Sequence, residues 1–291
     1  MLVEIRTSSA AATVETKGAE LQSLSDVLGT EYLWDGQKEF WNRRSPTLFP
    51  VIGVVKEQTA TIDGVDYPMP KHGIVRDVEF TVEAQTEDSV TLVYQACEDS
   101  LRHYPFAFAL HITYSLKGAE LTVGWRVDNL GDKAMPFQIG GHPAFRVPMG
   151  ENEQFEDYEL RFDCKEDFIS LRLDGEGLLR SDVLTVARNT DTIPLRHALF
   201  DDDALMFRGL QSSAVSLQSK KTGRGVRVTF GGFPYLGIWS PSARPAPFVC
   251  IEPWYGINSK QTDTTDFLAK EGMQSLAVGE RFFARYKIAL L

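Results

Sequence analysis

The chain has 291 residues, of which 43% are hydrophobic and 24% are charged, as is ordinary for a globular protein with a large core. The formal net charge of −10 argues against a nucleic-acid-binding surface, because neutralising phosphates requires clustered Lys and Arg. No stretch approaches the roughly 18 consecutive apolar residues of a membrane-spanning helix, and Glu4 interrupts the run that a signal peptide would need. We therefore expect a cytoplasmic protein with neither a nucleic-acid nor a membrane partner.

Alternating apolar and polar residues predict half-buried β-strands along most of the chain. The clearest segments are 78–83, 89–94, 121–127, 226–230 and 283–288. Turn signals separate them, and the strongest is Asp63-Gly64, because both residues tolerate a positive φ and short strand-like segments flank them. Helical signals are limited to short turns at 39–44 and 263–270. With no internal repeat and no linker, residues 1–291 are predicted to form one all-β, antiparallel domain, either a sandwich or a barrel.

The three cysteines, Cys97, Cys164 and Cys250, are an odd number without a CxxC pair, which favours a reducing compartment. Cys250 lies two residues before Glu252, so the two would share one face of a strand. We interpret Cys250 as a small packed apolar residue rather than a nucleophile, because no activating group is nearby in the sequence.

Gly140-Gly141-His142-Pro143 is the first candidate for a functional site. The glycines let the backbone run where a Cβ would not fit, and Pro143 disfavours the α region for His142. Glu252 precedes Pro253 in an apolar run, where a carboxylate is either paired or has a raised pKa. Such groups suit proton transfer near neutral pH. We therefore predict that His142 and Glu252 form an acid/base pair in one cleft.

Three further residues could line the same cleft. His72 follows two prolines and precedes Arg76, and local signals leave a structural and a functional role equally open. Asp203 ends an acidic run, which is typical of a solvated loop or a helix cap, but it adjoins an apolar segment and could point inward. Trp239 could offer a face to the C–H bonds of a pyranose, although most aromatic residues fill cores. The other histidines, His103, His111 and His197, are predicted to be structural or exposed.

Three stretches, taken in order, resemble the aldose 1-epimerase (galactose mutarotase) family: 72–77 with its His-Gly and Arg-Asp pairs, 140–145, and 252–254. The resemblance is closest to the branch with the lactose-operon X-type and hexose-6-phosphate mutarotase-like proteins. It extends nearly from end to end, beginning at 18–24. It implies a large antiparallel β-sandwich with a few short helices, and a sugar bound on its concave face.

The resemblance also implies roles for the candidate residues in interconverting the α and β anomers of an aldose, without metal or cofactor. Glu252 matches the general base that takes the proton of the anomeric O1, and His142 the general acid that protonates the ring oxygen. His72, Asp203 and Arg76 match residues that bind the sugar. The expected partner is a small-molecule sugar, and the chain would act as a monomer or a homodimer.

Basic residues depart from the family pattern. An arginine is common where this chain has Lys56, and a lysine would replace a rigid planar fork with a flexible point charge. Arg43 and Arg44 lie in a region that can meet phosphate in the sugar-phosphate branch, and a surface role is equally open. Which aldose is used, and whether it is phosphorylated, stays open at this point.

Three other readings stay open as well. The chain could be a non-catalytic sugar-binding or regulatory module of the same fold. It could be a glycosidase that uses Glu252 and Asp203 as its carboxylate pair. It could be a metal enzyme with His72, His142 and Glu252 as ligands, which is least favoured because these residues show no local ligand spacing.

Overall fold

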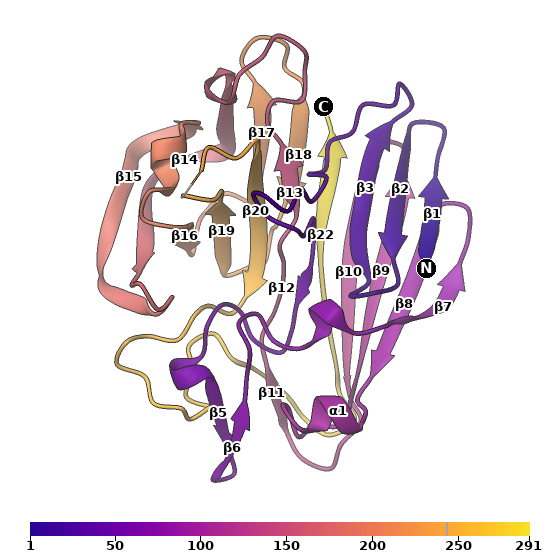
Figure 1. Cartoon of the computed structure of the whole chain (residues 1–291), viewed down its shortest axis with the longest axis vertical. Coiled ribbons are helices and arrows are strands. Elements are labelled where there is room, and N and C mark those ends of the chain that lie inside the picture. Colours follow the sequence, from indigo (N-terminus) through magenta and orange to yellow (C-terminus); the bar gives the residue numbers. More distant parts are fainter. Residues whose placement is uncertain (243) are drawn as a thin grey trace.

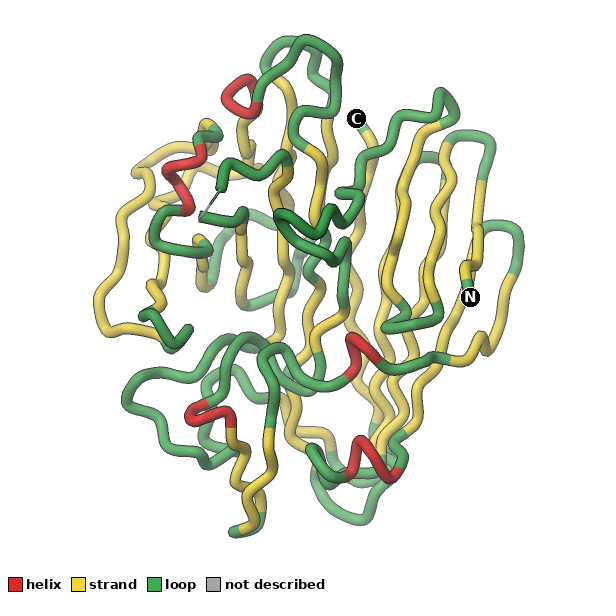
Figure 2. The backbone as a smooth tube through the Cα atoms, in the orientation of Figure 1, coloured by secondary structure: helices red, strands yellow, loops and turns green. Residues whose placement is uncertain are grey.

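The computed structural model describes residues 1–242 and 244–291, and most of their regular structure is β-strand (Figure 1, Figure 2). One sheet of 15 strands dominates, in the order β4-β12-β20-β19-β16-β14-β17-β18-β22-β10-β9-β8-β7, with β13 beside β20 and β15 beside β14. These strands are β4 (Thr47–Leu48), β7 (Thr81–Gln85), β8 (Ser89–Gln95), β9 (Phe108–Lys117), β10 (Glu120–Asn129), β12 (Ile139–Gly141), β13 (Ala144–Arg146), β14 (Tyr158–Leu173), β15 (Leu179–Pro194), β16 (Leu205–Arg208), β17 (Ala214–Ser219), β18 (Gly225–Thr229), β19 (Tyr235–Trp239), β20 (Phe248–Tyr255) and β22 (Arg281–Leu290). The predicted all-β, antiparallel sandwich is confirmed.

A second, three-stranded sheet forms the other layer on one side of the molecule. It consists of β1 (Leu2–Arg6), β2 (Ala10–Glu15) and β3 (Glu20–Asp26). Figure 1 shows these strands lying across β8–β10, and β1 contacts both β8 and β9. Val3 and Ile5 are buried on the inner face of β1, while their neighbours in the strand are exposed, as the two-residue period of a half-buried strand requires.

Short elements connect these layers. Two small sheets are the hairpin β5 (Thr59–Ile62) with β6 (Val65–Pro68), and the pair β11 (Met135–Phe137) with β21 (Gln274–Leu276). The helices are α1 (Glu98–Leu101) and the 3₁₀ turns η1 (Lys56–Gln58), η2 (Val75–Asp77), η3 (Phe155–Asp157) and η4 (His197–Phe200). Among the described residues, none of these helices has the length and apolarity needed to cross a bilayer.

Most of the predicted strands are confirmed. Segments 89–94, 121–127 and 283–288 lie within β8, β10 and β22. The segment predicted at 226–230 matches β18 up to Thr229, whereas the strand predicted at 78–83 starts only at Thr81. The Asp63-Gly64 hairpin is also confirmed, with φ of 53° and 78° at its two turn residues.

The helix predicted at 263–270 is wrong. The backbone of Thr61 binds this segment instead: its N–H donates to the Thr265 carbonyl at 2.8 Å, and its carbonyl accepts from the Phe267 N–H at 3.1 Å. These bonds use groups that a helix would pair internally. The turn predicted at 39–44 is present only at its start, where the Trp41 N–H donates to the Gln37 carbonyl at 3.0 Å.

Three hydrophobic clusters hold the fold together. The main one includes residues from both ends of the chain, such as Val3 and Ile288. Two smaller clusters lie around the candidate site described below, one centred on Trp254 and Met206 and the other on Phe248. Packed strands therefore carry the floor of the site, and loops supply the rest of its lining.

Candidate active site

The strand register brings His142 opposite Glu252. Gly140 pairs with Trp254 on one side of His142, and Ala144 pairs with Cys250 on the other, so position 142 falls in the gap beside 252. A Cβ on Gly140 would lie 2.4 Å from Cδ1 of Trp254, so only glycine lets β12 approach β20 this closely. The glycine doublet thus determines where the imidazole lies.

The two predicted catalytic residues are in contact and almost fully buried. His142 Nε2 lies 3.1 Å from Glu252 Oε2, and the residues are 8% and 1% exposed. The approach lacks hydrogen-bond geometry, and neither Nδ1 of His142 nor Oε2 of Glu252 has a hydrogen-bond partner in the part of the chain that the structure describes. Buried polar atoms without partners are rare and costly, so these are well suited to meet a ligand.

Burial shifts both groups toward their uncharged forms. It raises the pKa of Glu252 well above its usual value, an effect that Asp203 strengthens and the positive charge of Lys71 opposes. It lowers the pKa of His142 to about 3, with Arg76 and Lys71 adding to the effect. Without a ligand, Glu252 therefore holds the one proton of the pair as a neutral carboxyl group, and the imidazole of His142 is neutral.

Aromatic rings hold the imidazole of His142 in place. The Trp41 ring stacks on it, with centroids 4.8 Å apart and planes at 27°, and Trp239 meets it edge-on at 5.7 Å. Such contacts restrict the plane of the imidazole and leave its edge for polar contacts.

His72 approaches from a separate loop. Its Nδ1 accepts a hydrogen bond from the Gly53 N–H at 3.1 Å, and its ring centroid is 5.7 Å from that of His142. Burial lowers the pKa of His72 well below its usual value, so the ring is neutral and its proton is on Nε2. His72 therefore presents one N–H donor.

All these groups line one cleft with a volume of about 330 Å³, at the lower end of the range for small-molecule sites. Its lining residues are Trp41, Lys71, His72, Arg76, His142, Leu173, Asp203, Ala204, Met206, Trp239, Glu252, Trp254 and Asn258. Six of the seven predicted site residues are thus brought together. Carboxylate, imidazole and guanidinium groups lie between aromatic faces, as a site for a polar ring requires.

The structure also distinguishes the three neighbouring aspartates. Asp203 lines the cleft, in a left-handed conformation with φ of 79°. Asp202 instead pairs with Arg172 at 2.9 Å, and Asp201 lines a separate pocket with Asp202. Of the run, only Asp203 contributes to the cleft.

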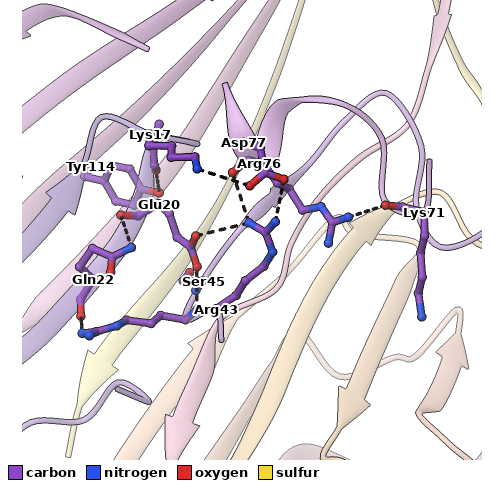
Figure 3. A network of polar contacts seen from close by, with 11 residues as sticks. Lys17, Glu20, Gln22, Arg43, Ser45, Lys71, Arg76, Asp77 and Tyr114 are labelled. Carbon is purple, nitrogen blue, oxygen red and sulfur yellow. Dashed lines mark hydrogen bonds and ion pairs between the residues drawn. The ribbon is translucent and has the colours of Figure 1, made fainter. Parts of the chain in front are cut away.

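Two cations lie on one wall of the cleft. Arg76 donates to the Lys71 carbonyl at 2.6 Å, and burial lowers the pKa of Arg76 to about 10. Figure 3 shows the Lys71 side chain extending away from the polar network behind it. No carboxylate among the described residues lies within 4 Å of its ammonium group.

Lys56 is not brought to the cleft. Its ammonium donates to the Gln261 carbonyl at 2.9 Å on an exposed surface, because η1 directs it toward the 257–270 loop. Arg43 and Arg44 also lie outside the lining. Arg43 pairs with Asp77 at 2.8 Å (Figure 3), and Arg44 donates to the Gln22 carbonyl. Both arginines therefore stabilise the wall behind the cleft.

The other predicted residues outside the site have structural surroundings. His111 contacts Glu83 at 2.9 Å, His103 contacts the Pro68 carbonyl at 2.6 Å, and His197 stacks on Phe155 at 3.9 Å. All three cysteines are free; only Cys250 is buried.

Sequence reasoning missed Trp41 and Asn258. Trp41 lay within a segment interpreted as a helical turn, and its position over His142 depends on contacts between distant segments. Asn258 follows β20 and donates to the Gly177 carbonyl at 2.8 Å. A buried polar residue three positions after the end of an apolar strand was the available signal for Asn258.

The antiparallel sandwich carries a cleft in which a buried histidine–carboxylate pair lies beside aromatic rings, as in a site for a small polar molecule. The model of the aldose 1-epimerase family matches residues 1–265, so the chain belongs to that family. The predicted family resemblance is thereby confirmed, and a mutarotase-type function is supported.

Particular relatives agree. The chromosomal LacX protein of Lactococcus lactis subsp. lactis is 36% identical over 267 residues, which cover 89% of each chain. A galactose mutarotase related enzyme from Lactobacillus acidophilus superimposes with a TM-score of 0.95 at 31% identity, covering 100% of this chain and 97% of that one. A galactose mutarotase-like protein from Lactobacillus casei gives a TM-score of 0.93 at 32% identity, covering 100% of both chains.

Proposed function

We propose that the protein is an aldose 1-epimerase that interconverts the α and β anomers of a hexose or related aldose. The observation that carries this proposal is the 3.1 Å contact between His142 Nε2 and Glu252 Oε2 in the wall of a sugar-sized cleft. Mutarotation needs one proton removed from O1 and one delivered to the ring oxygen. A single acid/base pair supplies both transfers.

In the proposed mechanism, the proton of the pair passes from Glu252 to Nε2 of His142, 3.1 Å away, when the sugar binds. Glu252 as carboxylate then takes the O1 proton while His142 as imidazolium protonates the ring oxygen. The bond between C1 and the ring oxygen breaks and the open-chain aldehyde forms. Rotation about C1–C2 and the reverse transfers close the ring on the other face. After ring opening the carboxyl group is protonated and the imidazole is neutral, and this is the form that burial of the pair favours.

Other lining residues would bind the sugar. The Nε2–H of His72 donates to a sugar oxygen, and the Asp203 carboxylate accepts from hydroxyl groups. The Arg76 guanidinium adds charged donors for further sugar oxygens. Trp41 and Trp239 offer apolar ring surface to the sugar C–H bonds. Lys56 has no part in this proposal, because its ammonium is bound elsewhere.

A second candidate function is mutarotation of a hexose 6-phosphate. Lys71 and Arg76 both line the cleft, and Lys71 has no carboxylate partner within 4 Å among the residues the structure describes. Two such cations favour a substrate that carries an anion, since phosphate oxygens accept charge-assisted hydrogen bonds.

The proposal is tested by following anomer exchange by NMR in freshly dissolved α-glucose, α-galactose and their 6-phosphates. We expect at least one of these sugars to equilibrate faster with protein than in buffer. Sugar binding without acceleration of any would instead support the non-catalytic module. Release of product from a chromogenic glycoside would support the glycosidase, and loss of activity after chelation would support a metal enzyme.

We further propose that residues 1–291 act as one domain in a reducing, cytoplasmic compartment. The main hydrophobic cluster, which includes both Val3 and Ile288, supports the single domain. The three free cysteines, two of them exposed, support the reducing compartment.

A further inference from the structure

We propose that His142, Cys250 and Glu252 form a binding site for one thiophilic divalent cation such as Zn²⁺, and that the bound cation inhibits the enzyme. Inhibition would follow because the cation occupies lone pairs of both catalytic groups. This consequence rests on the proposed function, whereas the binding site itself does not.

The three donor atoms are already close together. The ligating nitrogen of His142, Sγ of Cys250 and a carboxylate oxygen of Glu252 all lie within 4.8 Å of one another. Tetrahedral Zn²⁺ with bonds of about 2.0–2.3 Å spaces its ligand atoms by roughly 3.3–3.7 Å. Side-chain rotations that shorten the longest separation by about 1 Å therefore complete the set.

The backbone fixes this convergence. Cys250 and Glu252 are alternate residues of β20, so their side chains point to the same face of the sheet. His142 lies in the gap between two pairings with the same strand, Gly140 with Trp254 and Ala144 with Cys250. Two of the ligands thus come from β20, and the third comes from the two-residue break between β12 and β13, both of which pair with β20.

Glu252 is ready to accept a cation, because its Oε2 is buried without a hydrogen-bond partner among the described residues. Cys250 is a free cysteine packed among apolar side chains, so the cation displaces the thiol proton as it binds. His142 and Glu252 also line the cleft, which gives the cation a path inward and leaves a fourth position for water or a sugar hydroxyl. A set of nitrogen, sulfur and oxygen donors favours Zn²⁺ or Co²⁺ over Mg²⁺.

The binding experiment uses the full chain after treatment with a chelator and its removal. Co²⁺ is titrated while absorption is recorded, and Zn²⁺ affinity is measured by competition. We expect one Co²⁺ per chain, with thiolate-to-cobalt charge-transfer absorption in the near ultraviolet. Cys250→Ser and Cys250→Ala should lose this absorption and bind Zn²⁺ more weakly by at least the roughly 10–100-fold that is typical of losing an outer-shell partner. Cys97→Ser and Cys164→Ser are the controls, because both cysteines are exposed.

The inhibition experiment compares each variant with its own metal-free rate. Zn²⁺ should slow anomer exchange by the wild type, chelator should restore it, and the same Zn²⁺ concentration should slow Cys250→Ser much less. The binding proposal is overturned if Co²⁺ gives no thiolate absorption, if Cys250→Ser binds Zn²⁺ as tightly as the wild type, or if only the Cys97 or Cys164 variant loses the signal. A wild type that binds Co²⁺ through Cys250 but has no mutarotase activity would overturn the proposed function alone.

Discussion

The indole of Trp41 stacks on the imidazole of His142, with ring centroids 4.8 Å apart and planes at 27°. Its other contacts include a parallel stack on Phe248 at 5.9 Å. The carbonyl of Trp41 also accepts a hydrogen bond from Nε1 of Trp34 at 2.9 Å. Both backbone and side chain of Trp41 are therefore fixed, and the ring sets the plane in which His142 faces Glu252.

This contact predicts that Trp41→Ala lowers kcat/KM for anomer exchange by about three- to tenfold, the value of one aromatic contact. The reason is the loss of orientation of His142 and of apolar surface for the sugar. Trp41→Phe keeps a flat ring and should retain most of the activity. An alanine variant with wild-type kcat/KM would show that the stack has no role in the reaction.

Gly73 gives a test of how the backbone supports the site. A Cβ there would lie 2.0 Å from the Phe49 carbonyl oxygen, and φ is +77°. We expect Gly73→Ala to lower the free energy of unfolding by about 3 kcal/mol or more, because strain and a backbone clash add. The measurement is urea-induced unfolding.

Gly64→Ala is the matched control for that variant. Gly64 has nearly the same φ of +78°, but no atom lies within 4 Å of the place that a Cβ would take. Gly64→Ala should therefore lower the free energy of unfolding only by the strain of an alanine in the left-handed conformation, about 1–2 kcal/mol. Equal losses in the two variants would mean that the approach to Phe49 does not constrain the fold.

Local sequence patterns were sufficient for much of the sheet but not for its pairing. Strands such as β10 could be predicted because Leu121, Val123 and Trp125 alternate with less buried residues. The helix predicted at 263–270 failed because Thr61, far away in the chain, binds its backbone. Short local windows carry no information about such a partner.

The same limit applies to the site. His142 and Glu252 could be singled out because glycine and proline mark their segments, and the register explains why they meet. Lys56 and Trp41 could not be assigned correctly, since their positions depend on the 257–270 loop and on Phe248. The residue types indicated the acid/base chemistry of the site, but they did not indicate which side chains lie close together.

Lys270 predicts a pH dependence of stability. It is 5% exposed, and Nζ has no hydrogen-bond partner among the residues described. Burial lowers the pKa of Lys270 to about 7, although Asp263 and Glu271 oppose the shift. In the unfolded chain, Lys270 keeps its proton up to a pH of about 10.4. Burying the charged ammonium therefore lowers the free energy of unfolding by its full amount below about pH 7, and this loss disappears as the pH rises from there to about 10.4.

We therefore expect Lys270→Met to be more stable than the wild type by a few kcal/mol near pH 6.5, at about 1.4 kcal/mol per unit of pKa shift. The gap should shrink steadily between pH 7 and about pH 10. Urea unfolding at several pH values measures it, with Lys38→Met at an exposed position as control. A difference in the free energy of unfolding that is constant or grows with pH would contradict the lowered pKa of Lys270.

Lys71 predicts which substrates are preferred. If its ammonium binds a phosphate, Lys71→Ala should lower the ratio of kcat/KM for a hexose 6-phosphate to that for the same free hexose. The expected loss is about tenfold or more, the value of a hydrogen bond to a charged group. Lys56→Ala is the control, because Lys56 lies outside the cleft. An unchanged ratio in Lys71→Ala would leave the neutral sugar as the preferred substrate.

The most direct test of the central claim is anomer exchange by NMR for the wild type beside Glu252→Gln and His142→Asn. Both substitutions nearly preserve side-chain shape and remove proton transfer, so each variant should stay folded, with a thermal unfolding midpoint near that of the wild type. Each should exchange anomers at least 100-fold more slowly, on the order of the contribution of one positioned acid or base. A folded variant of either kind that retains near-wild-type exchange would contradict the acid/base roles of the pair.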